Sequence, residues 1–251
     1  MLHYGYFEDT SIRSEAISFQ KFEEAQEKYA LNIIEQIVDM ESPVLDVGCG
    51  TGGLSELVYH KNPNVESLTP NENQIDFINK NLGHLTTHNC KFEHFKADRK
   101  YGTVINSESL QYISLNEAFE KLDEIIMPDG RWIVVDYFRI NESGRSKSGH
   151  QLENFRQKIQ ENNWTVVEER DITLNILPTL SFIYMYVERL LLPVKHFGYE
   201  KLRYKKPKWY YMIRKLIKSI DNKIEKEVAA IDPDEFVKQK VYMFFVLEKK
   251  K

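Results

Sequence analysis

The stretch PVLDVGCGTGGLS, residues 43–55, restricts the fold more than any other part of this 251-residue sequence. Its apolar, β-branched start predicts a buried strand, and three glycines in the pattern G-x-G-x-x-G predict a tight turn that opens a helix. A strand, a glycine turn and a helix in this order are typical of βαβ units. We therefore expect an α/β fold with a parallel sheet, in which ligands bind at the carboxyl ends of the strands.

The rest of the chain continues this alternation of short apolar runs and helical patterns. Helices are predicted over residues 18–39, 53–59, 71–81, 114–126 and 148–161. Strands are predicted over residues 43–48, 64–69, 91–97, 102–109, 131–138, 164–172 and 240–248. Seven strands in this rhythm, with a long excursion before the last one, indicate a doubly wound, Rossmann-like sheet.

The composition is that of an ordinary globular protein, with 42% apolar and 29% charged residues. No run approaches the roughly 18–20 apolar residues of a membrane span, and the N-terminus lacks the pattern of an export signal. A cytoplasmic location is therefore expected. Cys49 and Cys90 have no C-x-x-C spacing, and His84 and His88 have no third ligand nearby, so we predict neither a disulfide nor a metal site.

The acid Asp46, two residues before Gly48, discriminates between two cofactors that use a glycine turn. A dinucleotide rests its pyrophosphate on the helix N-terminus, and a carboxylate at this point would repel it. S-adenosylmethionine brings a sulfonium and an ammonium group, which a carboxylate attracts. The turn therefore favours S-adenosylmethionine, and a nicotinamide dinucleotide is the less favoured alternative.

The motif VLDVGCGTG resembles the first motif of the class I S-adenosylmethionine-dependent methyltransferases. HYGYFED, VESLTPNENQ, NSESLQYI and IVVDYF are similar to further motifs of the small-molecule branch, which includes sugar O-methyltransferases and cyclopropane fatty acid synthases. The resemblance covers roughly residues 3–174 and the final strand. It implies a sheet that is mostly parallel with an antiparallel last strand, and S-adenosylhomocysteine as the product.

The same resemblance implies where the cofactor binds. Thr69 stands where most relatives have Asp or Glu for the ribose hydroxyls, and Gln74 is the expected second ribose anchor; a turn residue and a solvated helix residue are the alternatives. KADRK places Asp98 at the adenine amino group. The expected cofactor-binding residues are Asp46, Gly48, Gly50, Thr51, Gly52, Thr69, Gln74, Asp98, Ser107 and Tyr6.

The ends of the fourth and fifth predicted strands carry four polar residues: Glu108, Gln111, Tyr112 and Asp136. Asp136 matches an acid that pairs with a His in the sugar O-methyltransferases, but Gln111 and Tyr112 fill the His positions here. A Gln at 111, where the cyclopropane synthases have a Glu, argues against cyclopropanation. We expect Asp136 and Tyr112 to act on the acceptor or its proton; alternatively, Asp136 caps a loop and Tyr112 packs in the core.

The segment 175–238 falls outside the resemblance, and its aromatic residues suggest a helical lid over the acceptor. The expected organisation is an N-terminal lid segment and helix (1–40), a cofactor-binding core (41–174), this lid (175–238), and the last strand with a tail (239–251). Gln111, Tyr4, Tyr184 and Trp209 are expected to contact the acceptor. The aromatic residues of the lid could instead seal its helices onto the sheet.

Nine basic residues and one acid, Glu200, occupy the stretch from Lys195 to Lys218. The favoured partners are an anionic acceptor or acidic carrier protein, then an anionic membrane surface, and last a nucleic acid; a solvated helix face is the plainer explanation. The sequence thus predicts methyl transfer to a hydroxyl or amine of a small or lipid-like acceptor. The alternative is a non-catalytic methyltransferase-fold partner of another enzyme, which the replacements at Gln111 and Tyr112 favour.

Overall fold

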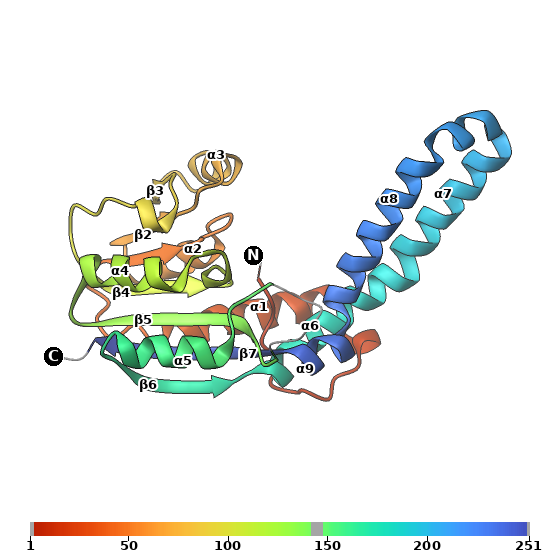
Figure 1. Cartoon of the computed structure of the whole chain (residues 1–251). Helices are drawn as coiled ribbons and strands as arrows, with labels where there is room; N and C mark the ends of the chain where they lie inside the picture. Colours follow the sequence, from red (N-terminus) through yellow and green to blue (C-terminus); the bar gives the residue numbers. More distant parts are fainter. Residues whose placement is uncertain (1–2, 142–147, 250–251) are drawn as a thin grey trace.

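The computed structural model of the chain describes residues 3–141 and 148–249 (Figure 1). Seven strands form one sheet in the order β3-β2-β1-β4-β5-β7-β6, with β7 antiparallel to both of its neighbours. The predicted doubly wound sheet with an antiparallel last strand is therefore confirmed. The strands are β1 (Val44–Val47), β2 (Val65–Leu68), β3 (Thr86–His88), β4 (Tyr101–Ser107), β5 (Ile126–Arg139), β6 (Trp164–Asp171) and β7 (Lys240–Lys249).

Helices cover both faces of this sheet. The α-helices are α1 (Phe19–Ile34), α2 (Gly53–Tyr59), α3 (Glu72–Asn81), α4 (Leu115–Ile125), α5 (Leu152–Glu161), α6 (Thr173–Tyr186), α7 (Leu192–Lys205), α8 (Pro207–Ile231) and α9 (Pro233–Gln239). Short helical turns are η1 (Ser14–Ala16), η2 (Phe92–His94), η3 (Leu110–Tyr112) and the π-helix η4 (Val187–Leu191). Side-chain caps fix several helix starts: Ser18 accepts from Lys21 N, and Asn71 accepts from Asn73 N.

The third strand lies elsewhere than the sequence predicts. The prediction of a strand over 91–97 is wrong. The strand that pairs with β2 is β3, the short segment Thr86–His88, and residues Phe92–His94 form η2. Phe92 and Phe95 are both buried. Their spacing of three fits the period of a 3₁₀ turn and does not fit the alternation of a strand.

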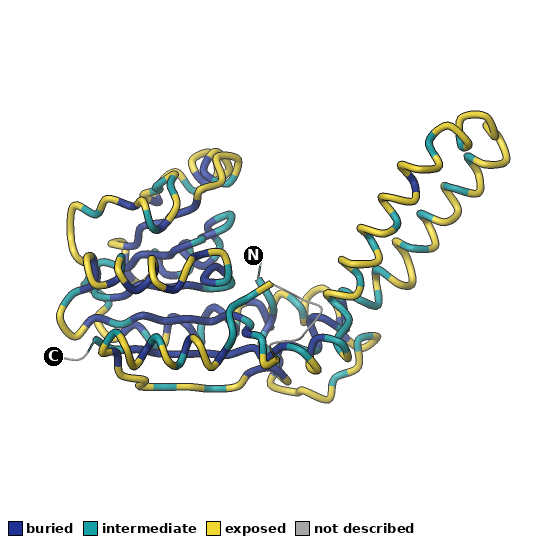
Figure 2. The backbone as a smooth tube through the Cα atoms, viewed as in Figure 1, coloured by how far each residue is buried: buried dark blue, intermediate teal, exposed yellow. Residues whose placement is uncertain are grey.

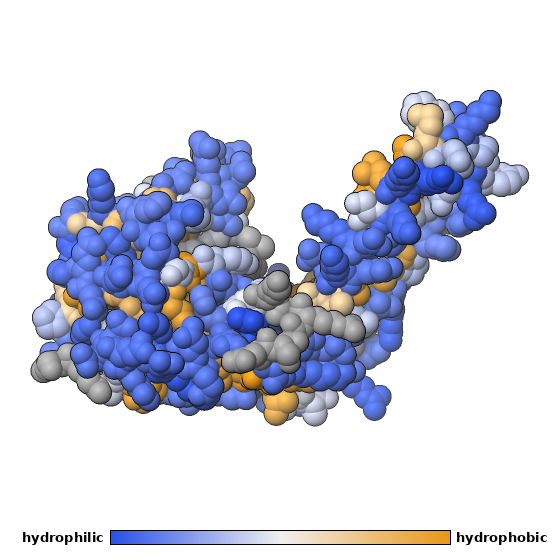
Figure 3. Space-filling view, in the orientation of Figure 1, coloured by the Kyte–Doolittle hydropathy of each residue, from blue (hydrophilic) through white to orange (hydrophobic). Residues whose placement is uncertain are grey.

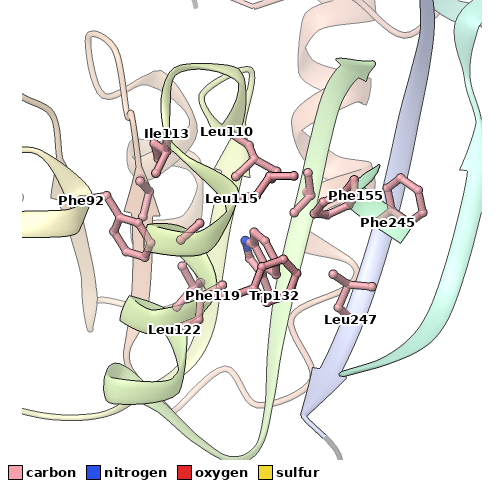
Figure 4. Close-up of a cluster of buried hydrophobic side chains, with 14 of the residues drawn as sticks. Phe92, Leu110, Ile113, Leu115, Phe119, Leu122, Trp132, Phe155, Phe245 and Leu247 are labelled. Carbon is pink, nitrogen blue, oxygen red and sulfur yellow. The ribbon is translucent and has the colours of Figure 1, made fainter. Parts of the chain in front are cut away.

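An aromatic cluster on one face of the sheet joins α4 and α5 to the central strands (Figure 4). Phe119 meets the Trp132 ring edge-on at a centroid separation of 5.1 Å, and Phe155 contacts both Trp132 and Phe245. The Trp132 indole is buried, and its N–H donates to Asn106 Oδ1 at 2.8 Å. This arrangement fixes β4 and β5, whose carboxyl ends carry the candidate acceptor residues.

The described N-terminal segment is docked between α1 and α6. Tyr6 N donates to Ala25 O at 2.8 Å, and Phe7 N donates to Asn175 O at 2.9 Å. The backbone approaches α1 closely at Gly5, where a Cβ would lie 2.8 Å from the Cβ of Ala25. These contacts hold the residues around Tyr4 at the carboxyl edge of the sheet.

The insertion between β6 and β7 has a packed part and a projecting part. Ile176 and Leu180 of α6 are fully buried, and their helix lies against the sheet. Helices α7 and α8 form a hairpin that extends away from the sheet as an arm (Figure 1), and most residues of the arm are exposed (Figure 2). In this structure the arm stands apart from the sheet, and its role as a lid over the acceptor stays a prediction.

One continuous helical run, Thr173–Lys205, has the length and hydropathy of a membrane span. It is 33 residues long, and the mean hydropathy of its most apolar 18-residue window is 1.2 with 28% of that window buried. The sequence pattern alone predicts no such segment. Because α6 is its first part and packs into the core, most of the exposed large apolar residues of this run lie beyond α6.

Candidate cofactor and acceptor site

A cavity of about 790 Å³ opens at the carboxyl ends of β1, β2 and β4. A second cavity of about 40 Å³ adjoins it, since both are lined by Gly48, Gly50 and Ser107. The predicted site residues that line the larger cavity are Tyr4, Gly48, Gly50, Thr69, Gln74, Ser107, Gln111 and Tyr112. Asp46 and Thr51 line the smaller one.

Two glycines of the turn after β1 have different roles. Gly48 has a φ of +77°, and a Cβ there would lie 2.3 Å from the Cβ of Ser109, so the turn passes tightly against the chain after β4. Gly50 has a φ of +58°, but a Cβ there would meet nothing within 4 Å. The bare backbone at Gly50 faces open space, which suits a cofactor that must approach the main chain closely.

Gly52 lines neither cavity. It is the N-cap of α2, with a φ of +83°, and a Cβ there would lie 3.1 Å from Leu82 and 3.2 Å from Ile78. Its small size therefore serves the packing of α3 against α2. The structure does not bring this predicted cofactor residue to the cavity wall.

Asp46 is buried at the smaller cavity. Ser55 Oγ donates to its Oδ2 at 2.6 Å. Burial nevertheless raises the pKa of Asp46 to about 6, because the low-dielectric surroundings disfavour the charged form. A cationic ligand group at this cavity would favour the ionised carboxylate, which is the chemistry expected for the methionine end of the cofactor.

Thr69 and Gln74 form a unit at the wall of the larger cavity. Thr69 Oγ1 donates to Gln74 Oε1 at 2.7 Å, and it accepts the Asn71 amide at 3.3 Å. The chain after β2 thereby presents a hydroxyl and an amide side chain at adjacent positions. This pair can hydrogen-bond a ribose without a carboxylate.

Asp98, predicted to bind adenine, is exposed and lies outside the set of residues that line the cavities. Lys91, Phe92 and Glu93 line the larger cavity instead. The difference follows from the early end of β3 at His88, because the residues that reach the carboxyl edge there come from η2. The adenine-binding role of Asp98 therefore stays a prediction, and Glu93 is the acid of this segment that lies at the cavity wall.

Glu108 is the carboxyl group that lines the larger cavity directly after β4. Its backbone is left-handed, with a φ of +56°, which is costly for a residue with a side chain. Its Oε1 accepts the Tyr4 amide at 2.9 Å and the Tyr242 hydroxyl at 2.7 Å. Burial raises the pKa of Glu108 to about 7. The sequence pattern places Glu108 at the end of a strand but predicts no role for it.

Asp136 is almost fully buried and does not line the cavity. Its Oδ2 accepts the Gln111 amide at 3.0 Å, and its Oδ1 accepts the Tyr137 amide at 2.8 Å. Burial raises the pKa of Asp136 to about 7, and the charge of Glu108 also raises it. The geometry thus places Asp136 behind the wall, where it fixes the backbone of η3 that carries Gln111 and Tyr112.

The remaining predicted site residues, which include Tyr6 for the cofactor and Tyr112 for catalysis, lie in different parts of the structure. Gln111 accepts a hydrogen bond from the Tyr137 hydroxyl at the wall, and Tyr112 is 81% exposed at the rim. Tyr6, Tyr184 and Trp209 lie outside the cavity lining: Tyr6 packs against the core, and Tyr184 lies at the base of the arm. Trp209 is on α8 of the arm. The spacing of residues in the sequence cannot predict the positions of Tyr184 and Trp209, because these positions depend on the direction in which the insertion leaves the core.

Across residues 3–141 and 148–249, no three His, Cys, Asp or Glu side chains gather in a way that could hold a metal ion.

Residues 44–130 match the family model described as a methyltransferase domain. The curated proteins include a relative, malonyl-[acyl-carrier protein] O-methyltransferase 2 of Ilyobacter polytropus, which is 27% identical over 116 residues. That match covers 41% of this chain and 44% of the relative, so it spans less than half of the relative's length.

Several solved structures share the fold over the whole chain. The [4+2]-cyclase SpnF matches with a TM-score of 0.71 at 14% identity, covering 99% of this chain and 87% of SpnF. Geranyl diphosphate C-methyltransferase of Streptomyces coelicolor A3(2), solved with S-adenosyl-L-homocysteine, matches with a TM-score of 0.70 at 14% identity, covering 100% and 92%. The cyclopropane synthase MmaA2 of Mycobacterium tuberculosis has a TM-score of 0.69 at 13% identity, covering 99% and 90%.

Proposed function

Because residues 44–130 match a methyltransferase-domain model and the fold is shared with a methyltransferase solved with S-adenosyl-L-homocysteine, we propose that the chain is a class I S-adenosylmethionine-dependent methyltransferase. It would transfer a methyl group to a hydroxyl or amine of a small or lipid-like acceptor. S-adenosylmethionine is the cofactor of this family, and when bound it supplies a methyl carbon that its sulfonium has already activated. The single observation that carries the proposal is the cavity at the ends of β1, β2 and β4. There the open backbone of Gly50 and the carboxyl of Glu108 line one space.

The cofactor would be held mostly by residues that the glycine motif and the following strand ends predict. Gly48 and Gly50 let the backbone approach the methionine portion, and the Asp46 carboxylate attracts its cationic groups. Thr69 and Gln74 would bond the ribose, since their side chains are already joined at the cavity wall. For the adenine amino group we propose the carboxylate of Glu93 in place of Asp98, because Glu93 lines the cavity.

Glu108 would accept the proton that a hydroxyl or amine acceptor loses. Its two hydrogen bonds, from Tyr4 and Tyr242, both end on Oε1. Within the described residues, Oε2 is therefore the oxygen left for the acceptor. A carboxyl with a pKa of about 7 is also a stronger base than an ordinary exposed glutamate. Asp136 supports this site through the η3 backbone and remains the second candidate base.

The acceptor class is supported by the size and lining of the cavity. A volume of about 790 Å³ must hold both cofactor and acceptor, so the acceptor portion inside is small or is one end of a longer molecule. Ile113 and Tyr137 give the acceptor side apolar and aromatic walls. An acceptor attached to an acidic carrier protein is a second form of this proposal, supported by the malonyl-[acyl-carrier protein] methyltransferase among the relatives.

Calorimetric titration with S-adenosylhomocysteine, with NAD as the control ligand, tests the cofactor. Micromolar affinity for S-adenosylhomocysteine alone is expected. Hydroxyl and amine acceptors are then screened with labelled methyl donor, using Glu108→Gln as the negative control. If folded, ligand-free protein fails to bind S-adenosylhomocysteine, the proposed function is wrong.

A non-catalytic role is the second candidate function. It is favoured by Gln111 and Tyr112, which replace the His expected from the sugar O-methyltransferases. SpnF, which is described as a [4+2]-cyclase, has the same fold, so the fold alone does not establish methyl transfer. Binding of S-adenosylhomocysteine without methyl transfer to any acceptor of the screen would favour this candidate.

A further inference from the structure

The arm, defined here as residues 192–231, joins α7 and α8 through Lys206 at its tip. The two helices are held together by an ion pair between Lys195 Nζ and Asp221 Oδ1 at 2.9 Å, and by the burial of Ile217. Figure 1 shows that the arm projects from the core beyond α6. It is therefore an ordered extension with two solvent-facing helices.

Each helix of the arm exposes apolar side chains at helical spacing. Leading into and along α7, Leu190, Val194, Phe197 and Tyr204 recur at intervals of four, three and seven and are exposed. On α8 the exposed residues with such spacing are Trp209, Met212, Leu216 and Ile220. Figure 3 shows apolar surface near the outer end of the arm, next to strongly hydrophilic surface. Contiguous exposed apolar surface of this kind indicates an interaction site.

The charge at the tip of the arm, residues 201–218, indicates which kind of partner it binds. Residues 201–218 contain eight Lys or Arg, no Asp or Glu, and four aromatic residues. Two copies of this tip would bring like charges together, which disfavours pairing of the arm with itself. Lysines and arginines beside Trp and Tyr on exposed apolar helices are the pattern of segments that lie in the interface of an anionic bilayer.

We propose that the tip of the arm, residues 201–218, inserts its aromatic and apolar side chains into the interface of an anionic membrane while its lysines and arginines bind the lipid headgroups. This membrane docking goes beyond methyl transfer and does not depend on it. It adds a reason for a lipid-like acceptor, because the docked arm would hold the catalytic domain close to the bilayer surface.

The three tryptophans of the chain make a direct test possible. Trp209 is 61% exposed on the arm, whereas Trp132 and Trp164 are 0% and 2% exposed in the core. Addition of vesicles of phosphatidylcholine with one quarter phosphatidylglycerol should shift the emission of Trp209 to the blue. Pure phosphatidylcholine vesicles should give little shift, and high salt should reverse the effect. Trp209→Phe should remove the shift.

Two triple variants distinguish specific membrane binding by the arm from nonspecific attraction between any lysines and anionic lipid. Lys205→Gln/Lys206→Gln/Lys208→Gln should weaken vesicle binding on the order of a hundredfold in a flotation assay, from the loss of three headgroup contacts. Replacement of three exposed lysines on the catalytic domain by Gln should have a much smaller effect and is the matched control. These control positions are Lys61, Lys80 and Lys96.

A variant that lacks an exposed aromatic ring tests whether the arm inserts apolar side chains into the bilayer. Trp209→Ala should weaken flotation roughly tenfold, and Phe77→Ala, which removes an exposed aromatic ring far from the arm, should leave it unchanged. Circular dichroism checks that each variant is folded.

Three results would overturn the proposal. They are no emission shift with anionic vesicles at low salt, equal weakening by the arm and control lysine variants, and a shift of Trp209 with an acidic acyl carrier protein but not with vesicles. The last result would assign the arm to protein recognition. None of these outcomes bears on whether the protein binds S-adenosylhomocysteine, so the proposed function is judged separately.

Discussion

The hydroxyl of Tyr242 donates a hydrogen bond of 2.7 Å to Oε1 of Glu108. The bond connects β7, the last strand of the sheet, to the residue that follows β4, and the Tyr4 amide completes the contact from the N-terminal segment. A carboxyl held from two sides cannot rotate freely. Glu108 is thus positioned at the cavity before any acceptor arrives, which is the condition for an efficient base.

Glu108→Gln should lower turnover about a hundredfold or more while S-adenosylhomocysteine affinity changes less than threefold. The amide keeps a carbonyl oxygen for the Tyr4 and Tyr242 donors but cannot take a proton. Since the pKa of Glu108 is raised to about 7, turnover of the unmodified protein should rise with pH through about 7 and then level off. Turnover close to that of the unmodified protein in this variant would return the role to Asp136.

Tyr242→Phe should move this pH profile to higher pH. The hydrogen bond from Tyr242 stabilises the ionised carboxylate, so its loss raises the pKa of Glu108 further. Initial rates measured between pH 6 and 9 check the shift. A profile that is merely scaled down, with no displacement along the pH axis, would contradict Glu108 as the titrating base.

Stability should fall as pH rises from about 5 to 8, and Glu108→Gln should reduce that fall. The pKa of Glu108 is 4.5 in ordinary surroundings and about 7 in the fold, so the folded state holds a proton that the unfolded state has released. The resulting stabilisation is complete below pH 4.5 and disappears as pH rises through 7. Thermal unfolding at several pH values measures it. Asp136 behaves in the same direction, so the reduction is partial.

Asp46→Asn should weaken binding of S-adenosylmethionine more than that of S-adenosylhomocysteine, because only the former carries a sulfonium charge. In the unmodified protein, affinity should fall below pH 6, by up to about tenfold per pH unit, since a cation binds the ionised carboxylate and the pKa of the free group is about 6. Calorimetry between pH 5 and 8 tests both points. An affinity that does not change with pH in this range would argue against contact between Asp46 and the cofactor.

Thr69→Val and Gln74→Leu should each weaken S-adenosylhomocysteine binding about three- to tenfold, the size of one lost hydrogen bond. Asp98→Asn is the control, since Asp98 is exposed outside the cavity and should change nothing. A larger loss of S-adenosylhomocysteine affinity with Asp98→Asn than with Glu93→Gln would favour Asp98 as the residue that binds the adenine amino group.

Gly48→Ala and Gly50→Ala should fail in different ways. A methyl at Gly48 collides with Ser109 in a left-handed backbone, so the melting temperature should drop markedly. A methyl at Gly50 meets open space and adds only backbone strain, so this variant should fold but lose most of its cofactor affinity. Equal melting temperatures for the two variants would contradict the packing argument.

Local sequence patterns were sufficient for most of the architecture, because β1 and β5 contain apolar, β-branched runs and α2 begins at a glycine turn. They failed at β3, where three residues carry too little periodicity to outweigh the neighbouring phenylalanines. At the site, the pattern located both Glu108 and Asp136 at strand ends. It could not tell which faces the cavity, because that depends on the left-handed backbone at Glu108 and on two amides that capture Asp136.

The docked N-terminal segment also bears on how the protein should be handled. Tyr4 is part of the cavity wall, so a purification tag fused ahead of it would emerge beside the opening through which ligands pass. Strand β7 ends at Lys249, at the opposite edge of the sheet, where Glu248 pairs with Arg131. Material for binding and turnover measurements is therefore best tagged at the C-terminal end, where a fusion leaves the entrance to the cavity unobstructed.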